Sequence, residues 1–283
     1  MTATIQRAMG IVLATFLWLT AGPTLAAERR EKPGRMCALL IGVNKYENVA
    51  AIDRKDDLKF AENDAQGLGQ ALRAAGFADE DVVVMTTAEP ADGRLSPRAA
   101  NIRKELRSLL KGLTHADTVL VAFAGYEMQF AGSDEYYICP ADADKSDKKT
   151  LVSLSELYDE LGQAKAGCKI VIVDSCRLLE GRRGAKAPKA PPKGVAVLFA
   201  CSGGENAFEV PDKKHGVLSY YLREGLRGAA DEDGDGQVTW SELVPYVQDR
   251  VSGYVKKNLK ASQTPVVVGR TGEFQVAVSP KDR

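Results

Sequence analysis

The sequence predicts an α/β fold of the doubly wound type, with a mostly parallel six-stranded sheet covered by helices on both faces. Short continuous apolar runs, typical of strands buried on both faces, alternate along the chain with longer segments whose apolar residues recur at helical spacing. The 283 residues carry 27% charged side chains and no net formal charge, which suits a soluble globular domain. This balance gives no case for a nucleic acid as the main partner.

The first half of the chain supplies three of the expected strands. In chain order the sequence predicts strands at 36–43, 81–86 and 117–125 and helices at 58–76 and from Ser96 onward. Gly76 is the expected stop of the first helix, because glycine readily adopts the backbone conformation that ends a helix. Ser96 followed by Pro97 predicts the start of the second helix, a capping residue and then a first-turn proline.

The second half continues the alternation. Here the sequence predicts a short strand at 135–140, a helix at 154–164, central strands at 168–174 and 194–201, and edge strands at 264–269 and 273–278. In open parallel sheets, functional side chains gather beyond the carboxyl ends of the strands. We therefore expect the site among the residues at three such ends, 122–127, 172–177 and 198–205.

Residues 1–27 have the pattern of a secretory signal peptide. Arg7 precedes a stretch without charge that lasts until Glu28, and its strongly apolar part is too short for a comfortable membrane span. Small residues end the segment, so we expect cleavage after Ala26 or Ala27; an uncleaved anchor is the alternative. The sequence therefore predicts an exported protein, periplasmic or secreted, with no stable membrane span after cleavage and a folded domain over 33–279.

The segment 177–193 breaks the compact pattern. It is rich in Arg, Lys, Ala and Pro, and we expect an exposed, partly extended loop that peptidases can nick.

The chain has five cysteines, an odd number, so at least one thiol is free unless it pairs with another chain. Cys37, Cys139 and Cys168 lie in or beside apolar runs and are expected to be small buried hydrophobes. Cys176 follows a buried strand at a point where the chain is expected to leave the sheet. It is either a nucleophile or a packing residue. A disulfide with Cys201 is geometrically conceivable, although two strand-end cysteines more often stay apart.

Residues 231–242 fit the twelve-residue calcium-binding loop of an EF-hand in full. Gly236 permits the sharp turn, and helix-like segments flank the loop. The expected ligands are Asp231, Asp233, Asp235, the backbone carbonyl of Gln237, Thr239 through water, and Glu242. We expect a weak structural calcium site; a polar helix–helix turn that resembles such a loop is the alternative.

The chain from about Arg35 to Val278 resembles the caspase-like cysteine peptidases of the metacaspase-type bacterial branch. The segments that carry the resemblance, in order and spacing, are CALLIGVNKY, ENDAQGLGQAL, VLVAFAGYE, IVIVDSCR, LFACSGGENAFE and HGVLSYYLREGLRGAAD. The resemblance implies a caspase-like domain with a large-subunit-like part (35–180), a basic proline-rich loop (181–193) and a small-subunit-like part (194–279). It also implies that Cys176 is the nucleophile and that Asp174 lies in a pocket for Arg or Lys side chains. A structural aspartate that binds backbone amides is the other interpretation of Asp174.

The chain departs from this family at two functional positions. The histidine that should assist the cysteine is replaced by Tyr126, and the following glycine, which would help to hold the oxyanion, by Glu127. A phenol with a pKa of about 10 is a poor base at neutral pH, and a carboxylate near the thiol disfavours the thiolate. Loss of acid–base help costs about 10²–10⁴ in rate, and a misplaced oxyanion site a further 10²–10³ or so.

Only two histidines exist to take over this role. His115 is expected at the opposite end of the sheet. His215 lies at a helix start, and a loop would have to bring it to Cys176.

Three functions follow as hypotheses. The first is an exported pseudopeptidase with an impaired dyad that binds basic peptides or protein partners; the basic residues of 182–193 are candidate occupants of its pocket. The second is an active Arg/Lys-directed cysteine endopeptidase that uses Cys176. The third is a calcium-stabilised structural or interaction module.

Overall fold

The computed structural model describes residues 34–52, 57–179 and 188–277. The predicted signal peptide (1–27) and part of the basic loop lie outside these residues. Within the described ranges, no helix has both the length and the apolar character needed to cross a bilayer.

A central sheet organises the domain, with strand order β11-β7-β6-β3-β1-β2. Its strands are β1 (Met36–Gly42), β2 (Val82–Thr86), β3 (Thr118–Gln129), β6 (Cys168–Leu179), β7 (Val195–Phe199) and β11 (Val266–Gly269). Neighbouring strands are parallel except for β11, which runs antiparallel to β7 at the edge. This is the mixed, mostly parallel six-stranded sheet that the sequence predicts. The short strands β4 (Tyr136–Ile138) and β5 (Val152–Ser153) attach to the end of β3.

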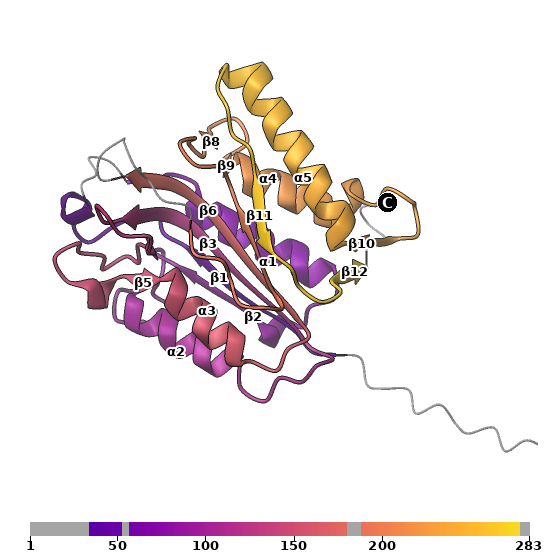
Figure 1. The fold of residues 1–283 in the computed structure, drawn as a ribbon, viewed down its shortest axis with the longest axis horizontal. Coiled ribbons are helices and arrows are strands. Elements are labelled where there is room, and N and C mark those ends of the chain that lie inside the picture. Colours follow the sequence, from indigo (N-terminus) through magenta and orange to yellow (C-terminus); the bar gives the residue numbers. More distant parts are fainter. Residues whose placement is uncertain (1–33, 53–56, 180–187, 278–283) are drawn as a thin grey trace, which may run out of the picture. The chain divides into compact units, whose positions relative to one another are not determined.

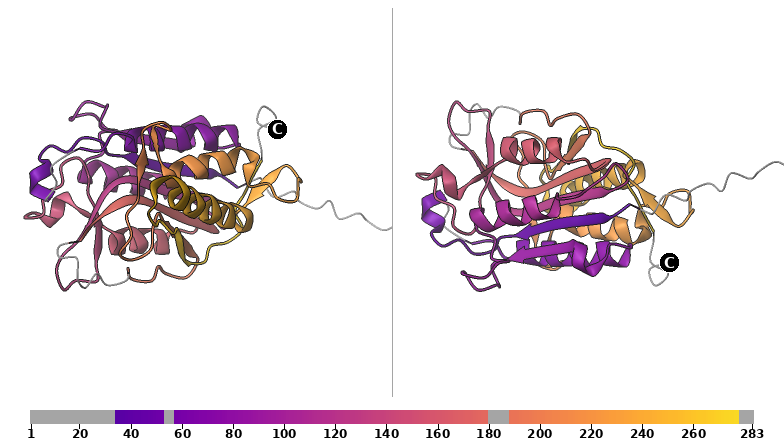
Figure 2. Two further views of the ribbon diagram at one scale, coloured as in Figure 1. Left: turned by 90° about the horizontal axis from the view of Figure 1, so that it is seen from above. Right: turned by 90° about the horizontal axis from the view of Figure 1, so that it is seen from below.

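Helices cover both faces of this sheet (Figure 1). They are α1 (Ala61–Ala74), α2 (Ala99–Leu109), α3 (Leu154–Gln163), α4 (Val217–Glu224) and α5 (Trp240–Tyr254), with short helical turns at η1 (Val49–Ile52), η2 (Asp79–Asp81), η3 (Lys148–Thr150), η4 (Gly225–Ala229) and η5 (Val255–Leu259). Helices α2 and α3 pack on one face through one apolar core, and α1, α4 and α5 pack on the other through a second core. In Figure 2, α5 is accordingly nearest in the view from above and α2 in the view from below.

Two further pairs of strands lie outside the central sheet. They are β8 (Glu209–Val210) with β9 (His215–Gly216), and β10 (Gln237–Thr239) with β12 (Gln275–Ala277). The prediction that 273–278 forms an edge strand of the main sheet is therefore wrong. Its apolar residues Phe274 and Val276 are instead buried in the core under α5, where β12 pairs with β10, the strand directly before that helix.

The predicted start of the second helix at Ser96 is also wrong. Helix α2 begins at Ala99, and the backbone N–H of Ala99 donates to Asp142 Oδ1 at 2.9 Å. A carboxylate distant in sequence therefore supplies the cap that Ser96 was expected to provide.

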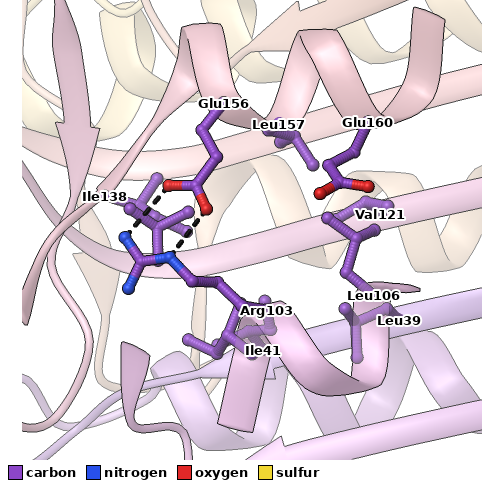
Figure 3. A pocket seen from close by; sticks show the side chains of 11 residues that line it. Leu39, Ile41, Arg103, Leu106, Val121, Ile138, Glu156, Leu157 and Glu160 are labelled. Atoms are coloured by element: carbon purple, nitrogen blue, oxygen red, sulfur yellow. Dashed lines mark hydrogen bonds and ion pairs between the residues drawn. The ribbon is translucent and has the colours of Figure 1, made fainter. Parts of the chain in front are cut away.

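The space between α2, α3 and the sheet contains a small apolar pocket of about 10 Å³ (Figure 3). Arg103 on α2 and Glu156 on α3 close it with an ion pair, in which Arg103 Nε lies 2.7 Å and Nη2 3.0 Å from the carboxylate oxygens. The volume is that of about one water molecule, so we regard the pocket as a packing defect and not as a ligand site.

Candidate functional site

Strands β3 and β6 bring Cys176, the predicted nucleophile, next to Tyr126, the residue at the expected histidine position. The parallel register places Tyr126 opposite Cys176, Glu127 opposite Arg177, and Ala124 opposite Asp174. These strands continue as paired strands to Gln129 and Leu179, beyond the expected ends at 125 and 174 (Figure 1). The prediction that the chain leaves the sheet at Cys176 is wrong, because β3 and β6 keep hydrogen-bonding each other and β4 joins β3 on its other side.

Tyr126 is held firmly in this position. Its side chain is 6% exposed, and its ring stacks on Tyr46 with centroids 5.2 Å apart. Its backbone N–H donates to the Tyr46 hydroxyl at 2.8 Å, and its carbonyl accepts from the N–H of Cys139 at 2.9 Å. A residue fixed by stacking and by both backbone groups cannot easily move aside for another group.

Glu127 is one of the most deeply buried charged residues, with 1% exposure. Its electrostatic effect reaches Tyr158 on α3: burial chiefly raises the pKa of Tyr158, and the negative charges of Glu127 and Glu135 raise it further. That the carboxylate of Glu127 lies near the thiol of Cys176 stays a prediction, because the structure does not describe the side chain of Cys176.

Asp174 lies at a buried position of β6 and accepts two hydrogen bonds from the first turn of α4. Its Oδ2 receives the N–H of Ser219 at 3.0 Å and the hydroxyl of Ser219 at 2.6 Å. Asp174 thus binds a backbone amide, as its structural interpretation expects. Asp174 also lines a pocket of about 20 Å³ together with Asp64 and Glu209, so the second interpretation stays open.

Asp64 is the residue that sequence reasoning missed. It lies on the buried face of α1 and accepts the N–H of Gly216 at 3.1 Å. A Cβ at Gly216 would lie 2.8 Å from Asp174 Oδ2 and 3.0 Å from Asp64 Oδ2, so both carboxylates converge on this glycine. The signal was present in the sequence: Asp64 occupies the apolar stripe of the predicted helix, three residues after Ala61 and four before Leu68.

Burial dominates the protonation of this pair. It raises the pKa of Asp174 to about 7, with a further contribution from the charge of Asp64. Burial also raises the pKa of Asp64 well above its usual value, against the hydrogen bond from Gly216 and the charge of Arg223. Two buried carboxyls that resist ionisation side by side form a site that a cation would stabilise.

His215 is fully engaged next to this pair. Its Nδ1 lies 2.8 Å from Asp64 Oδ1, and its Nε2 lies 2.6 Å from Nη1 of Arg223. Because a guanidinium can only donate, Nε2 accepts and Nδ1 carries the proton. Burial, aided by the charge of Arg223, lowers the pKa of His215 to about 4. The expected structural role of His215 agrees with this geometry.

His115 is exposed in the turn before β3, at the amino end of that strand, as predicted. Cys176 lies in the later part of β6, opposite the later part of β3. His115 is thus at the wrong end of the sheet to serve the cysteine, and both ring nitrogens of His215 are already engaged.

The remaining cysteines behave as packing residues. Cys37 and Cys168 are buried free thiols, and Cys139 and Cys201 are also buried. Burial raises the pKa of Cys37 to about 12, which keeps that thiol protonated. The Sγ of Cys201 lies 3.5 Å from the carbonyl oxygen of Glu205. The described residues do not test the disulfide with Cys176, which the sequence made conceivable but did not favour.

The acidic loop 231–242 brings three predicted ligands together. Carboxylate oxygens of Asp231, Asp233 and Asp235 lie within 4.8 Å of one another, and Asp231 Oδ2 accepts the N–H of Gly236. Oxygen ligands in this arrangement suit calcium. Glu242 instead caps α5: its Oε2 accepts the N–H of Thr239 at 2.8 Å, and its Oε1 accepts the N–H of Glu232 at 3.1 Å. Its role as a metal ligand stays a prediction.

Comparison with known proteins shows which family the chain resembles. Residues 35–274 match the family model for the caspase domain. Metacaspase-3 of Arabidopsis thaliana is 25% identical over 69% of the chain, and metacaspase-1 of Mycosarcoma maydis is 25% identical over 50% of it. The alignments span 60% and 35% of those two relatives.

Solved structures show the same fold at low sequence identity. A Geobacter sulfurreducens protein superposes with a TM-score of 0.60 at 16% identity, covering 83% of this chain and 94% of its own. Caspase-1 of Spodoptera frugiperda superposes with a TM-score of 0.57 at 16% identity, covering 84% of this chain and 87% of its own.

Proposed function

The chain belongs to the caspase-domain family, and we propose that it binds basic peptides or protein partners without cleaving them. The observation that carries this proposal is the pairing of Tyr126 with Cys176, at the place where we assign the assisting histidine of the family. A cysteine peptidase needs a base for the thiol proton and an acid for the leaving amine. A phenol is a poor base at neutral pH, and Asp64 and Arg223 hold both nitrogens of His215.

The binding site in this proposal is the acidic pocket of Asp174, Asp64 and Glu209, which at about 20 Å³ would have to widen to admit a side chain. A lysine or arginine side chain there would supply the positive charge that two buried carboxyls lack. Asp174 Oδ2 already receives two bonds from Ser219, so the ligand would use the remaining lone pairs of the cluster. Glu209 accepts the N–H groups of Lys59 and Phe60 at the start of α1, which fixes one wall of the pocket.

Calorimetric titration tests this binding. A short peptide with a central arginine is compared with the same peptide carrying norleucine at that position. We expect binding of the arginine peptide alone, and at least tenfold weaker binding by Asp174→Asn, which keeps the shape and removes the charge. Equal affinity for both peptides would contradict the proposal.

The alternative function is an active Arg/Lys-directed cysteine endopeptidase. It is favoured by the acidic pocket beside the strand that carries Cys176, since such a pocket orients a basic residue next to a nucleophile. It requires a base other than the two histidines. The third candidate, a calcium-stabilised structural module, predicts that capture of a partner is unchanged in Asp174→Asn.

Two further parts of the proposal concern calcium and location. We assign a weak structural calcium site to the loop 231–242, supported by the convergence of its three aspartates and by its match to the EF-hand pattern. We also assign the mature protein to the periplasm or the exterior, supported by the apolar character of residues 1–27.

A further inference from the structure

Residues 188–193 lead into β7 and lie against α3 and β11; we call this segment the strap. A Cβ at Gly162 in α3 would lie 3.4 Å from Cγ of Pro192, and a Cβ at Gly269 in β11 would lie 2.6 Å from Cγ of Pro191. Gly269 has φ +81°, a conformation that favours glycine. The strap thus contacts two elements through its prolines.

The side chain of Lys189 makes the polar contact of the strap. Its Nζ donates to Glu135 Oε2 at 2.9 Å, lies 3.4 Å from Ser155 Oγ, and lies 3.9 Å from Asp134 Oδ1. The expectation that the basic residues of 182–193 fill the pocket of Asp174 does not hold for Lys189. The other basic side chains of 182–187 lie outside the described residues.

Glu135 is also held by bonds that do not involve the lysine. Its Oε1 accepts the backbone N–H of Ser155 at 3.0 Å, and its Oε2 accepts the Ser155 hydroxyl. The carboxylate therefore lies at the N-terminus of α3, where the helix dipole favours negative charge. Its side chain is 13% exposed, against 46% for that of Lys189.

The charge on Glu135 persists under this partial burial. Burial pushes the pKa of Glu135 upward, but the hydrogen bonds from Ser155 and Lys189 outweigh it and hold the pKa below its usual value. A fixed carboxylate with a hydroxyl beside it and a second carboxylate nearby is well suited to a primary ammonium group.

A second observation points to more polar capacity here than the cap of α3 uses. The hydroxyl of Tyr158, on the same helix as Ser155, is buried and has no hydrogen-bond partner among the described residues, and burial and the charges of Glu127 and Glu135 raise its pKa. Ser153 caps α3 by accepting the N–H of Glu156 at 3.0 Å, so the cap needs neither Glu135 nor Lys189. The lysine contact is therefore an addition to the cap and calls for its own explanation.

We propose that Glu135 and Ser155 form an ammonium-binding site for Lys189 of the same chain, and that this docking shields the Lys189–Ala190 bond from peptidases that cut after lysine. Such a peptidase must draw the lysine side chain into its own acidic pocket and the backbone into its cleft. The ammonium must first leave Glu135, and the prolines must leave Gly162 and Gly269. Cleavage then follows the population of the undocked strap. The inference does not rest on whether Cys176 is active.

Limited digestion of the full mature chain with a lysine-specific endopeptidase tests this inference, with peptide mapping by mass spectrometry. We expect cleavage after Lys189 to be far slower in the native chain than in the chain unfolded in urea. Glu135→Gln keeps an acceptor for Ser155 and loses the charge, and we expect it to be cut after Lys189 about threefold to tenfold faster than wild type.

The matched control is Glu160→Gln. Glu160 lies on α3, as Ser155 does, and its ion pair is with Arg107 of α2, so its loss should leave cleavage after Lys189 unchanged. Ser155→Ala serves as a second variant if Glu135→Gln unfolds. Lys189→Arg keeps the charge and, digested with trypsin, should remain protected.

Three results would overturn the inference. One is cleavage after Lys189 that is as fast in the native chain as in the unfolded one. The others are equal acceleration in the Glu135 and Glu160 variants, and cleavage after residue 189 in Lys189→Arg as fast as in its unfolded chain. None of them would affect the proposed peptide binding.

Discussion

Tyr126 lies directly opposite Cys176 in the parallel pair formed by β3 and β6, and its backbone N–H is bound by the hydroxyl of Tyr46. The residue beside the cysteine is therefore part of a packed aromatic pair. This relationship leads to the first prediction.

Tyr46→Phe should destabilise the domain by about 1–2 kcal/mol, because it leaves the buried N–H of Tyr126 without its acceptor while keeping the ring stack. Urea unfolding of wild type and variant measures this difference. Tyr254→Phe, on the half-buried face of α5, is the control and should change stability by less than about 0.5 kcal/mol. A loss no larger than that of the control would show that the bond contributes nothing.

Gly216→Ala should cost about 1–3 kcal/mol, because its Cβ would press on the carboxylates of both Asp174 and Asp64. Gly253→Ala is the matched control: a Cβ at this position of α5 meets no atom within 4 Å. That substitution should stabilise the helix by about 0.5–1 kcal/mol. The two melting temperatures should therefore move in opposite directions, and a shift of both in the same direction would refute the convergence of the two carboxylates.

The stability of the domain should depend on the protonation of Asp174. Its pKa is about 7 in the folded chain and about 4 in the unfolded chain. The stability that protonated Asp174 contributes is thus fully present below about pH 4 and is lost as the pH rises through 7. Asp174→Asn removes this dependence, so the stability of the variant relative to wild type should increase from pH 4 to pH 7. Unfolding curves at several pH values measure this, and parallel profiles would contradict it.

His215 acts in the opposite direction over the same range. Its pKa falls from about 6.5 in the unfolded chain to about 4 in the folded chain. Its contribution is present above pH 6.5 or so and is lost as the pH falls through 4. His215→Gln should therefore lose least, relative to wild type, at the acid end of the range. A constant difference across that range would exclude a neutral, buried His215.

Calcium should raise the melting temperature of the mature chain if the loop 231–242 binds it. At a concentration ten times the dissociation constant, the gain is about 1.4 kcal/mol. Asp233→Asn should abolish the shift, whereas Asp249→Asn on the exposed side of α5 should leave it intact. No shift in millimolar calcium would remove the proposed site.

Much of the fold could be predicted from the sequence, because buried parallel strands have a strong apolar signal. The strands expected at 36–43, 81–86 and 194–201 contain β1, β2 and β7 with an error of one or two residues. The errors arise where contacts distant in sequence decide the outcome. Asp142 caps α2, and the mutual pairing of β3 and β6 extends both strands past Gly125 and Asp174.

Part of the candidate site could also be predicted from the sequence. Strand ends pointed to Asp174, Tyr126 and Cys176, and the register brings their backbones together. The apolar stripe of the helix indicated that Asp64 is buried, but its bond to Gly216 depends on the packing of α1 against the start of α4, which no local pattern encodes. The engagement of both nitrogens of His215 likewise depends on two residues from different helices.

The most direct test of the central claim is the hydrolysis of reporter peptides ending in arginine or lysine by the mature chain, with Cys176→Ala alongside. We predict no hydrolysis above the Cys176→Ala background near neutral pH, and a gain of activity in Tyr126→His combined with Glu127→Gly. Hydrolysis by wild type that disappears in Cys176→Ala would contradict the account and establish the active endopeptidase.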